Sequence, residues 1–261
     1  MDSAFIKFLG SAGARVVVAK QLRSSAGVYI AAQGQNLILD PGPGTLVRCA
    51  KSRPPIDVTQ LDALILTHAH LDHSNDVNIL IDAMTAGGLK RRGTLFAPQE
   101  CLEGDKAVVL SYLKSYLEKI IVLTPEQNYQ IGELKFSTSL RHRHPVETYG
   151  IKFDFDGRPV AFLVDTGYFP GLLESYKDSW ILIINVVRAY PHKSGEVMHL
   201  CLDEVRQILA AIRPRKAILT HFGMTMLKAK PWQVAQELTK ELGIEVIAAS
   251  DGLKLDIGGE G

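Results

Sequence analysis

The sequence predicts a layered α/β domain whose helices lie outside its sheets. Short apolar runs of strand length alternate along the chain with segments in which apolar residues recur at helical spacing. A tight-turn signal joins two of the runs, so hairpins occur among the alternating elements. No low-complexity segment, charge block or Pro/Gly-rich linker divides the chain. We therefore expect a single domain over residues 1–261.

The predicted strands are short apolar runs bounded by turn residues. Asp156-Gly157 stands between two of them, and Asp-Gly favours the tight turn of a β-hairpin, so we expect 149–165 to form one. The strand candidates in chain order are 28–32, 37–39, 61–67, 94–97, 120–123, 134–140, 149–155, 159–165, 181–187, 216–220 and 245–249.

Four segments have the apolar spacing of a helix that buries one face. The first ends at Gly87-Gly88 and the third at Pro214. The fourth has Pro231 in its first turn and Gly243 just past its end, the usual asymmetry of these two residue types. The predicted faces are Val77, Leu80, Ile81 and Met84; Val109, Leu113, Tyr116 and Ile120; Val205, Ile208, Leu209 and Ile212; and Trp232, Ala235, Leu238 and Leu242.

Composition argues for a cytoplasmic protein that binds neither membrane nor nucleic acid through its net charge. The 29 Lys+Arg residues nearly balance the 28 Asp+Glu residues. The first residues lack the basic-then-apolar order of a secretory signal, and no apolar run reaches the roughly 18 residues of a membrane span. Cys49, Cys101 and Cys201 are far apart and form no C-x-x-C pair, so we expect buried thiols in a reducing compartment.

The stretch "LILTHAHLDHSND" (64–76) predicts a metal site. A buried strand runs directly into His68, His70, Asp72 and His73. On a loop leaving a strand these side chains can turn inward together, whereas a regular strand would send His70 and His73 to opposite faces. Neutral imidazole and carboxylate are ligands of zinc and similar divalent ions.

"THAHLDH" (67–73) resembles the H-x-H-x-D-H signature of the metallo-β-lactamase superfamily. The resemblance implies a four-layer αββα sandwich with mixed sheets, and one or two metals at the edge between them. It continues in order along the chain through "NLILDPGPG" (36–44), "HPVETYGIKF" (144–153), "AFLVDTG" (161–167) and "AILTHFG" (217–223).

Carried over by position, the resemblance implies a ligand set for two metals. In "RHRHP" His142 and His144 share a strand face, and the family register favours His144. One metal is then held by His68, His70 and His144, the other by Asp72, His73 and His221, with Asp165 as the bridge. We expect zinc, with manganese and iron as alternatives.

The chemistry of the residues agrees with this ligand set. Each assigned ligand lies at or just after the C-terminal end of an apolar run, so all can meet at one sheet edge. Two cations at about 3.5–4 Å need a bridging anion, which Asp165 and a hydroxide can provide. Asp40 is either an acceptor for the N–H of a ligand histidine or a turn aspartate before Pro41.

A dinuclear site with an open position generates hydroxide near neutral pH and polarises an electrophile, which predicts a hydrolase. His199 lies 22 residues before His221. The ribonuclease Z branch and the related cyclic phosphodiesterases carry a histidine in this relation, which assists the leaving oxygen. We therefore expect Asp72 and His199 to be catalytic. The alternative for His199 is a cap of the helix that follows.

The expected substrate is a small or single-stranded phosphodiester. Ribonuclease Z enzymes that process tRNA carry an extended arm, commonly between the third histidine and the bridging aspartate. Only 21 residues separate His144 from Asp165 here, which leaves no room for an arm and argues against specific tRNA binding. Arg188, His192 and Lys193 form a loop that either contacts phosphate or is solvated. Relatives are often dimers, so a homodimer is an expectation.

Other activities remain open for the same site. The main alternative is an acyl hydrolase acting on a lactone or thioester, as in glyoxalase II-like relatives, and it does not require His199. Flavodiiron relatives typically have glutamate where His70 stands and a flavodoxin partner domain, and neither is present in this sequence. Two further alternatives are a persulfide dioxygenase-like protein with a single iron, and a binding module without catalytic activity.

Overall fold

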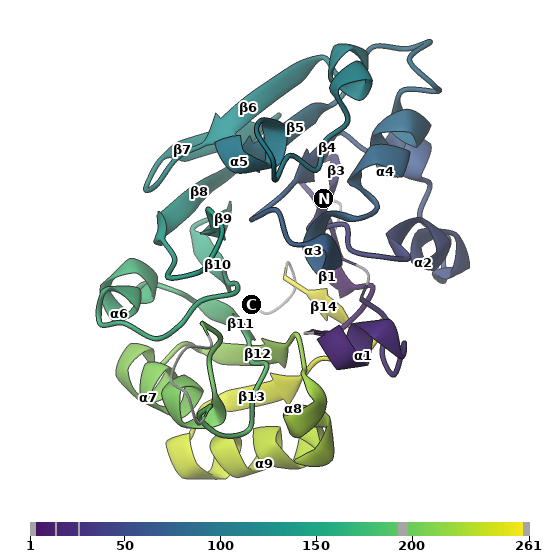
Figure 1. The fold of residues 1–261 in the computed structure, drawn as a ribbon. Coiled ribbons are helices and arrows are strands. Elements are labelled where there is room, and N and C mark those ends of the chain that lie inside the picture. Colours follow the sequence, from purple (N-terminus) through teal and green to yellow (C-terminus); the bar gives the residue numbers. More distant parts are fainter. Residues whose placement is uncertain (1–3, 14, 26, 193–197, 258–261) are drawn as a thin grey trace.

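The structure, a computed structural model, describes residues 4–13, 15–25, 27–192 and 198–257. Two seven-stranded sheets pack face to face, and helices lie on both outer surfaces (Figure 1). The first sheet has the order β14 (Lys254–Asp256), β1 (Phe5–Phe8), β2 (Val28–Ala32), β3 (Gln35–Leu39), β4 (Ala63–Ile65), β5 (Thr94–Pro98) and β6 (Lys119–Leu123).

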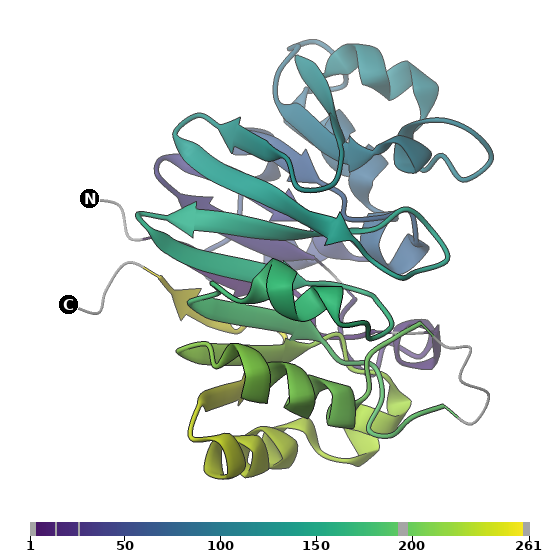
Figure 2. The same ribbon diagram turned by 90° about the vertical axis from the view of Figure 1, so that its left-hand side faces the viewer.

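The second sheet lies in front of the first when the molecule is turned by 90° (Figure 2). Both sheets are mixed: the strands from β3 to β6 and from β10 to β13 run parallel, and the others pair antiparallel. The second sheet has the order β13 (Glu245–Ala248), β12 (Lys216–Thr220), β11 (Ile181–Asn185), β10 (Arg158–Leu163), β9 (Tyr149–Phe155), β8 (Leu134–Arg141) and β7 (Asn128–Ile131).

The helices complete four layers. α2 (Thr45–Lys51) and α4 (Val77–Met84) cover the first sheet, while α6 (Gly171–Tyr176), α7 (Leu202–Ile212) and α9 (Pro231–Leu242) cover the second (Figure 1). The remaining helical elements in the described ranges are α1 (Arg15–Ala19), α3 (Leu71–Ser74), α5 (Gln99–Leu102), α8 (Met224–Lys228) and the 3₁₀ helices η1 (Val58–Gln60) and η2 (Ser111–Tyr116).

Three apolar clusters hold these layers together. One fills the space between the sheets and includes Phe8 and Phe153, and the other two lie under the helices on either side. Each fully buried side chain of this size contributes about 1.5–3 kcal/mol. The predicted αββα sandwich with mixed sheets is therefore confirmed.

The β9–β10 hairpin and three of the four predicted helices are confirmed. Asp156 (φ 54°) and Gly157 (φ 81°) both have the positive φ that a two-residue type I′ turn requires. α4 buries its predicted face, and α7 and α9 bury theirs except that Ile212 and Leu242 are only partly buried. Trp232 is 52% exposed, and Val234 is buried in its place. The apolar stripe of α9 is thus rotated from the predicted one.

The predicted helix with the face Val109 to Ile120 is wrong. This segment forms the short 3₁₀ helix η2, and Ile120 lies in β6. Lys119 already pairs with Thr94 in the first sheet, so the chain must leave helical geometry at Leu117. Strand pairing in the first sheet therefore determines the conformation of this segment, although its apolar residues have helical spacing.

β4 ends earlier than predicted, and this matters for the site. Predicted to run over 61–67, the strand spans only Ala63–Ile65. The backbone N–H of Thr67 instead donates to the Asp40 carboxylate at 2.7 Å, which turns the chain out of the sheet just before His68.

No helix in the described ranges has the length and apolar content that a bilayer span requires.

Candidate metal centre

Polar side chains from separate segments meet at one edge between the two sheets. His68 and His70 lie on the loop after β4, and Asp72 and His73 lie on α3. The structure brings all seven predicted ligands into this region; the other three are His144 after β8, Asp165 after β10 and His221 after β12.

The first cluster contains one donor atom each from His68, His70, His144 and Asp165, all within 4.8 Å of one another. Nε2 of His144 lies 3.0 Å from Nδ1 of His70. Oδ2 of Asp165 lies 3.9 Å from Nε2 of His68 and 4.0 Å from Nε2 of His144. Three imidazoles and a carboxylate thus surround one point.

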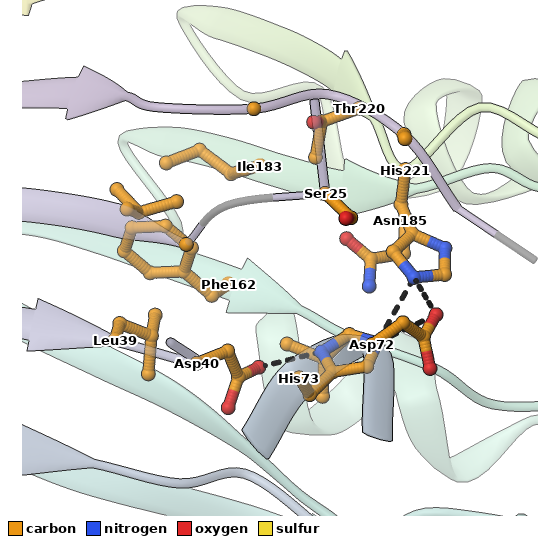
Figure 3. Close-up of a pocket in the computed structure, with 15 residues that line it drawn as sticks. Ser25, Leu39, Asp40, Asp72, His73, Phe162, Ile183, Asn185, Thr220 and His221 are labelled. Atoms are coloured by element: carbon orange, nitrogen blue, oxygen red, sulfur yellow. Dashed lines mark hydrogen bonds and ion pairs between the residues drawn. The ribbon is translucent and has the colours of Figure 1, made fainter. Parts of the chain in front are cut away.

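The second cluster contains Asp72, His73 and His221 (Figure 3). Nε2 of His73 lies 2.9 Å from Nε2 of His221, which lies 3.3 Å from Oδ2 of Asp72. Oδ2 of Asp165 is 3.5 Å from Nε2 of His73, so the same oxygen faces both clusters. This is the arrangement expected of a bridging carboxylate.

The donor atoms fit a bound cation. Among the described residues, Nε2 of His68 and Nδ1 of His221 are buried without a hydrogen-bond partner, although buried polar atoms normally have one. A cation would satisfy Nε2 of His68, which points into the first cluster. Nitrogen and carboxylate oxygen donors in sets of three and four suit zinc and similar divalent ions.

Hydrogen bonds on the far side of the rings orient three of the histidines. Nδ1 of His73 lies 2.9 Å from Oδ2 of Asp40, and Nδ1 of His68 lies 2.9 Å from Oγ1 of Thr67. Nδ1 of His144 donates to the carbonyl of Met198 at 3.1 Å. With the proton on Nδ1, the Nε2 lone pair of each ring points at its cluster. Asp40 therefore accepts from a predicted ligand, one of the two roles that its sequence position allowed.

His142 lies outside both clusters. Its Nδ1 lies 3.2 Å from the Asp165 carbonyl and its Nε2 lies 2.8 Å from the Tyr176 hydroxyl. Burial lowers the pKa of His142 to about 4, so the ring is neutral and can donate from one nitrogen while it accepts on the other. Of the two histidines in "RHRHP", the geometry places His144 in the cluster.

A family model described as a beta-lactamase superfamily domain matches residues 35–222. This range includes every predicted metal ligand.

The chain belongs to the metallo-β-lactamase superfamily.

Two relatives match this chain, one over nearly its whole length and one over about half of it. The uncharacterized protein MJ1374 of Methanocaldococcus jannaschii is 30% identical, over 97% of this chain and 94% of its own length. A UPF0173 metal-dependent hydrolase of Staphylococcus aureus is 26% identical over 54% of this chain and 60% of its own.

Two solved structures share the fold. The metallo-β-lactamase fold protein YhfI of Bacillus subtilis has a TM-score of 0.79 at 19% identity, with 98% of this chain and 100% of YhfI covered. A diphosphatase from the PhnP family has a TM-score of 0.71 at 22% identity, with 97% of each chain covered.

The charges of this superfamily site depend on one another. Burial alone would lower the pKa of His73, but the carboxylates of Asp72, Asp165 and Asp40 raise it well above the ordinary value. Burial likewise opposes ionisation of Asp165, yet His221, His199 and His73 hold its pKa well below the usual range. Without a cation, the carboxylates are balanced only by protonated imidazole. A divalent ion would supply that positive charge instead.

His199 lies beside both clusters. Its Nδ1 is 3.6 Å from Oδ2 of Asp165 and, among the described residues, is buried without a hydrogen-bond partner. Burial lowers the pKa of His199, and the Asp165 carboxylate acts in the opposite direction. The following helix α7 is capped by Cys201, whose N–H donates to Glu204 at 2.8 Å, so His199 is not the cap.

Arg23 connects segments that are far apart in the chain. It donates to Oγ of Ser11 and to the Ala249 carbonyl, and its guanidinium lies 5.3 Å from the ring of Phe222. Nε of Arg188 donates to the carbonyl of Tyr190 at 3.2 Å. His192 is exposed, and Lys193 lies outside the described residues.

Sequence reasoning missed two residues of the site. Nδ2 of Asn185 donates to Oδ1 of Asp165 at 2.8 Å. The signal in the sequence is a lone amide within the apolar run "WILIINVV" (180–187). Gly13 packs against the ring of His221, from a segment outside the range of the family model. Nothing in the sequence near Gly13 indicates that contact.

Proposed function

We propose that this chain is a metal-dependent phosphodiesterase with a dinuclear centre, acting on a small or single-stranded phosphodiester. The observation that carries the proposal is His199, whose buried and unpartnered Nδ1 faces Asp165 beside both clusters. Hydrolysis of an acyl bond does not require a side chain at the position of His199 to protonate the leaving group. A phosphodiester with a basic leaving oxygen does.

The two clusters would hold the metals as the sequence predicts. His68, His70 and His144 would hold one ion, Asp72, His73 and His221 the other, and Asp165 both. Bound divalent ions supply a water of lowered pKa and polarise the phosphoryl oxygens. We propose zinc as the ion.

Two residues of the chain would move protons. Burial opposes ionisation of Asp72, but His73 and His221 keep its pKa below the usual range, so its carboxylate is ionised. Because this carboxylate lies in the second cluster, we assign to it the proton that the attacking water loses. As the new phosphorus–oxygen bond forms and the ester bond breaks, the departing alkoxide needs a proton or a positive charge. The imidazole of His199 is placed to donate that proton or to stabilise the charge.

Chain length near the site supports a small substrate. The interval from His144 to Asp165 contains only the β9–β10 hairpin and its short flanks. The net charge of +1 offers no general attraction for a polynucleotide. A diphosphatase from the PhnP family shares the fold, which supports a substrate that contains phosphate.

The test compares two phosphodiesters that differ in the leaving group. An alkyl phosphodiester has a strongly basic leaving oxygen, whereas p-nitrophenolate departs nearly unaided. His199→Ala should reduce turnover of the alkyl diester by the roughly 10²–10⁴-fold typical of a general acid. The loss on bis(p-nitrophenyl) phosphate should be much smaller, and the metal content should stay that of the wild type.

Two outcomes would count against the proposal. Equal losses on both esters would assign His199 to structure or to uniform binding. Wild-type protein that hydrolyses a lactone or an acyl thioester briskly, and no phosphodiester, would make the protein an acyl hydrolase with the same metal site.

A further inference from the structure

Asn185 is an amide in an otherwise apolar row. It ends β11, and Ile181 and Ile183 on the same face of that strand belong to the core between the sheets. Asn185 is itself buried, at 9% exposed. A buried amide costs free energy unless its polar atoms are bonded, so this position requires a partner.

The partner is the carboxylate of Asp165 on the neighbouring strand end. β10 and β11 run parallel, which places Asp165 and Asn185 at the same edge. Nδ2 of Asn185 lies 2.8 Å from Oδ1 of Asp165. Because an ionised carboxylate can only accept, the amide must present its nitrogen to it.

This bond gives the two oxygens of Asp165 different surroundings. Oδ1 is held by Asn185 and also lies 3.5 Å from Nδ1 of His221, whose other nitrogen faces Asp72 and His73. Oδ2 lies 3.9 Å from Nε2 of His68 in the first cluster and 3.5 Å from Nε2 of His73 in the second. A single oxygen therefore faces both clusters. Figure 3 shows the Asn185 side chain between the strands, next to His221 and facing Asp72 and His73 across the pocket.

We infer that Asn185 is a positioning residue that makes Asp165 bridge the two metal positions through Oδ2 alone. The inference rests on the metal site of the proposed function and adds how the two positions are coupled. A neutral donor suits this task, because a cationic donor would withdraw the charge that Asp165 shares between two ions. Without the amide, the carboxylate can rotate about its Cβ–Cγ bond and bind one ion with both oxygens.

The test uses Asn185→Leu, which keeps the approximate volume and removes the donor. Ile183→Ala is the matched control, since it removes core packing on the same face of the same strand and leaves the amide of Asn185 in place. Chelator-treated protein is titrated with manganese(II) and followed by electron paramagnetic resonance. The signal of unbound manganese(II) at each addition gives the dissociation constants of the two sites. Exchange coupling between the two bound ions shows whether Asp165 bridges them.

We expect wild type and Ile183→Ala to bind two coupled ions. In Asn185→Leu the affinity for the second ion should fall by about 10–100-fold, the usual effect of losing a residue that orients a ligand. Its exchange coupling should weaken as well. Asn185→Ala lacks the same donor and gives the same readout if the leucine variant does not fold.

Two results would overturn the inference. One is a pair of folded Asn185 variants with wild-type affinities and coupling, and the other is a wild type that binds fewer than two ions. A wild type without phosphodiesterase activity that shows the expected metal pattern would contradict the proposed function and support this inference, because neither readout uses turnover.

Discussion

Gly13 controls where the ring of His221 can lie. A Cβ atom added at Gly13 would stand 2.5 Å from Cγ of His221, and closer still to Nδ1 and the carbonyl oxygen of the same residue. The segment cannot easily move away, since the N–H of Gly13 donates to the Phe222 carbonyl at 3.1 Å. His221 is itself constrained, with φ of 60° in the left-handed region that few side chains adopt.

The size of the disturbance follows from these distances. Ordinary contact begins near 3.4 Å, so Gly13→Ala must displace Cγ of His221 by about 0.9 Å and the closer ring atom Nδ1 by more. Metal–ligand distances tolerate only about 0.2 Å, so the site of His221 should lose its ion while the three-histidine site keeps its own. Overpacking of this kind costs about 1–3 kcal/mol. For a chain of this size that corresponds to a fall of about 2–12 °C in the unfolding temperature.

Elemental analysis after reloading, together with thermal unfolding, measures both effects. Gly167→Ala is the matched control, because its Cβ would meet the nearest atom, Cα of Met198, at an ordinary 3.5 Å. The control should keep two ions and nearly the wild-type unfolding temperature. If Gly13→Ala also kept two ions and unfolded with the wild type, the reasoning that His221 depends on this close approach would be refuted.

Three further results are expected. His144→Ala should lose the ion of the three-histidine site, while His142→Ala should keep its metal content and unfold at a lower temperature; elemental analysis with the opposite pattern would exchange the two histidines. Chelation should lower the unfolding temperature and added zinc should restore it, because one ion at 1,000 times its dissociation constant stabilises the folded state by about 4 kcal/mol; an unfolding temperature that does not respond would argue against resident metal. Burial raises the pKa of Cys49 to about 12, and Cys101 and Cys201 are buried too. At pH 8 a thiol reagent should therefore label three cysteines only as the chain unfolds, and rapid labelling of folded protein would contradict their burial.

The residues that would bind metal could be found from the sequence because metal chemistry limits the choice. Few residue types donate to a divalent ion. The six positions from His68 to His73, directly after an apolar strand, contain four such side chains. Asp165 and His221 follow strands of the second sheet, whereas His68 follows β4 of the first. They were assigned to the same site because "AFLVDTG" and "AILTHFG" resemble the ligand segments of the superfamily.

What the sequence left undecided depends on contacts between distant segments. Between 109 and 120 the helical spacing was misleading, because pairing of Lys119 with Thr94 ended the helix early. Asp40 fitted two roles until folding placed its carboxylate against Nδ1 of His73.

Local sequence determined which donors this protein carries and on which strand ends they stand, because ligand chemistry and strand periodicity act over a few residues. Only the tertiary structure decided how those donors are aimed. The amide of Asn185 fixes the rotation of Asp165, and the missing side chain of Gly13 makes room for His221. Both effects are contacts between segments far apart in the chain, and spacing along the sequence carries no information about them.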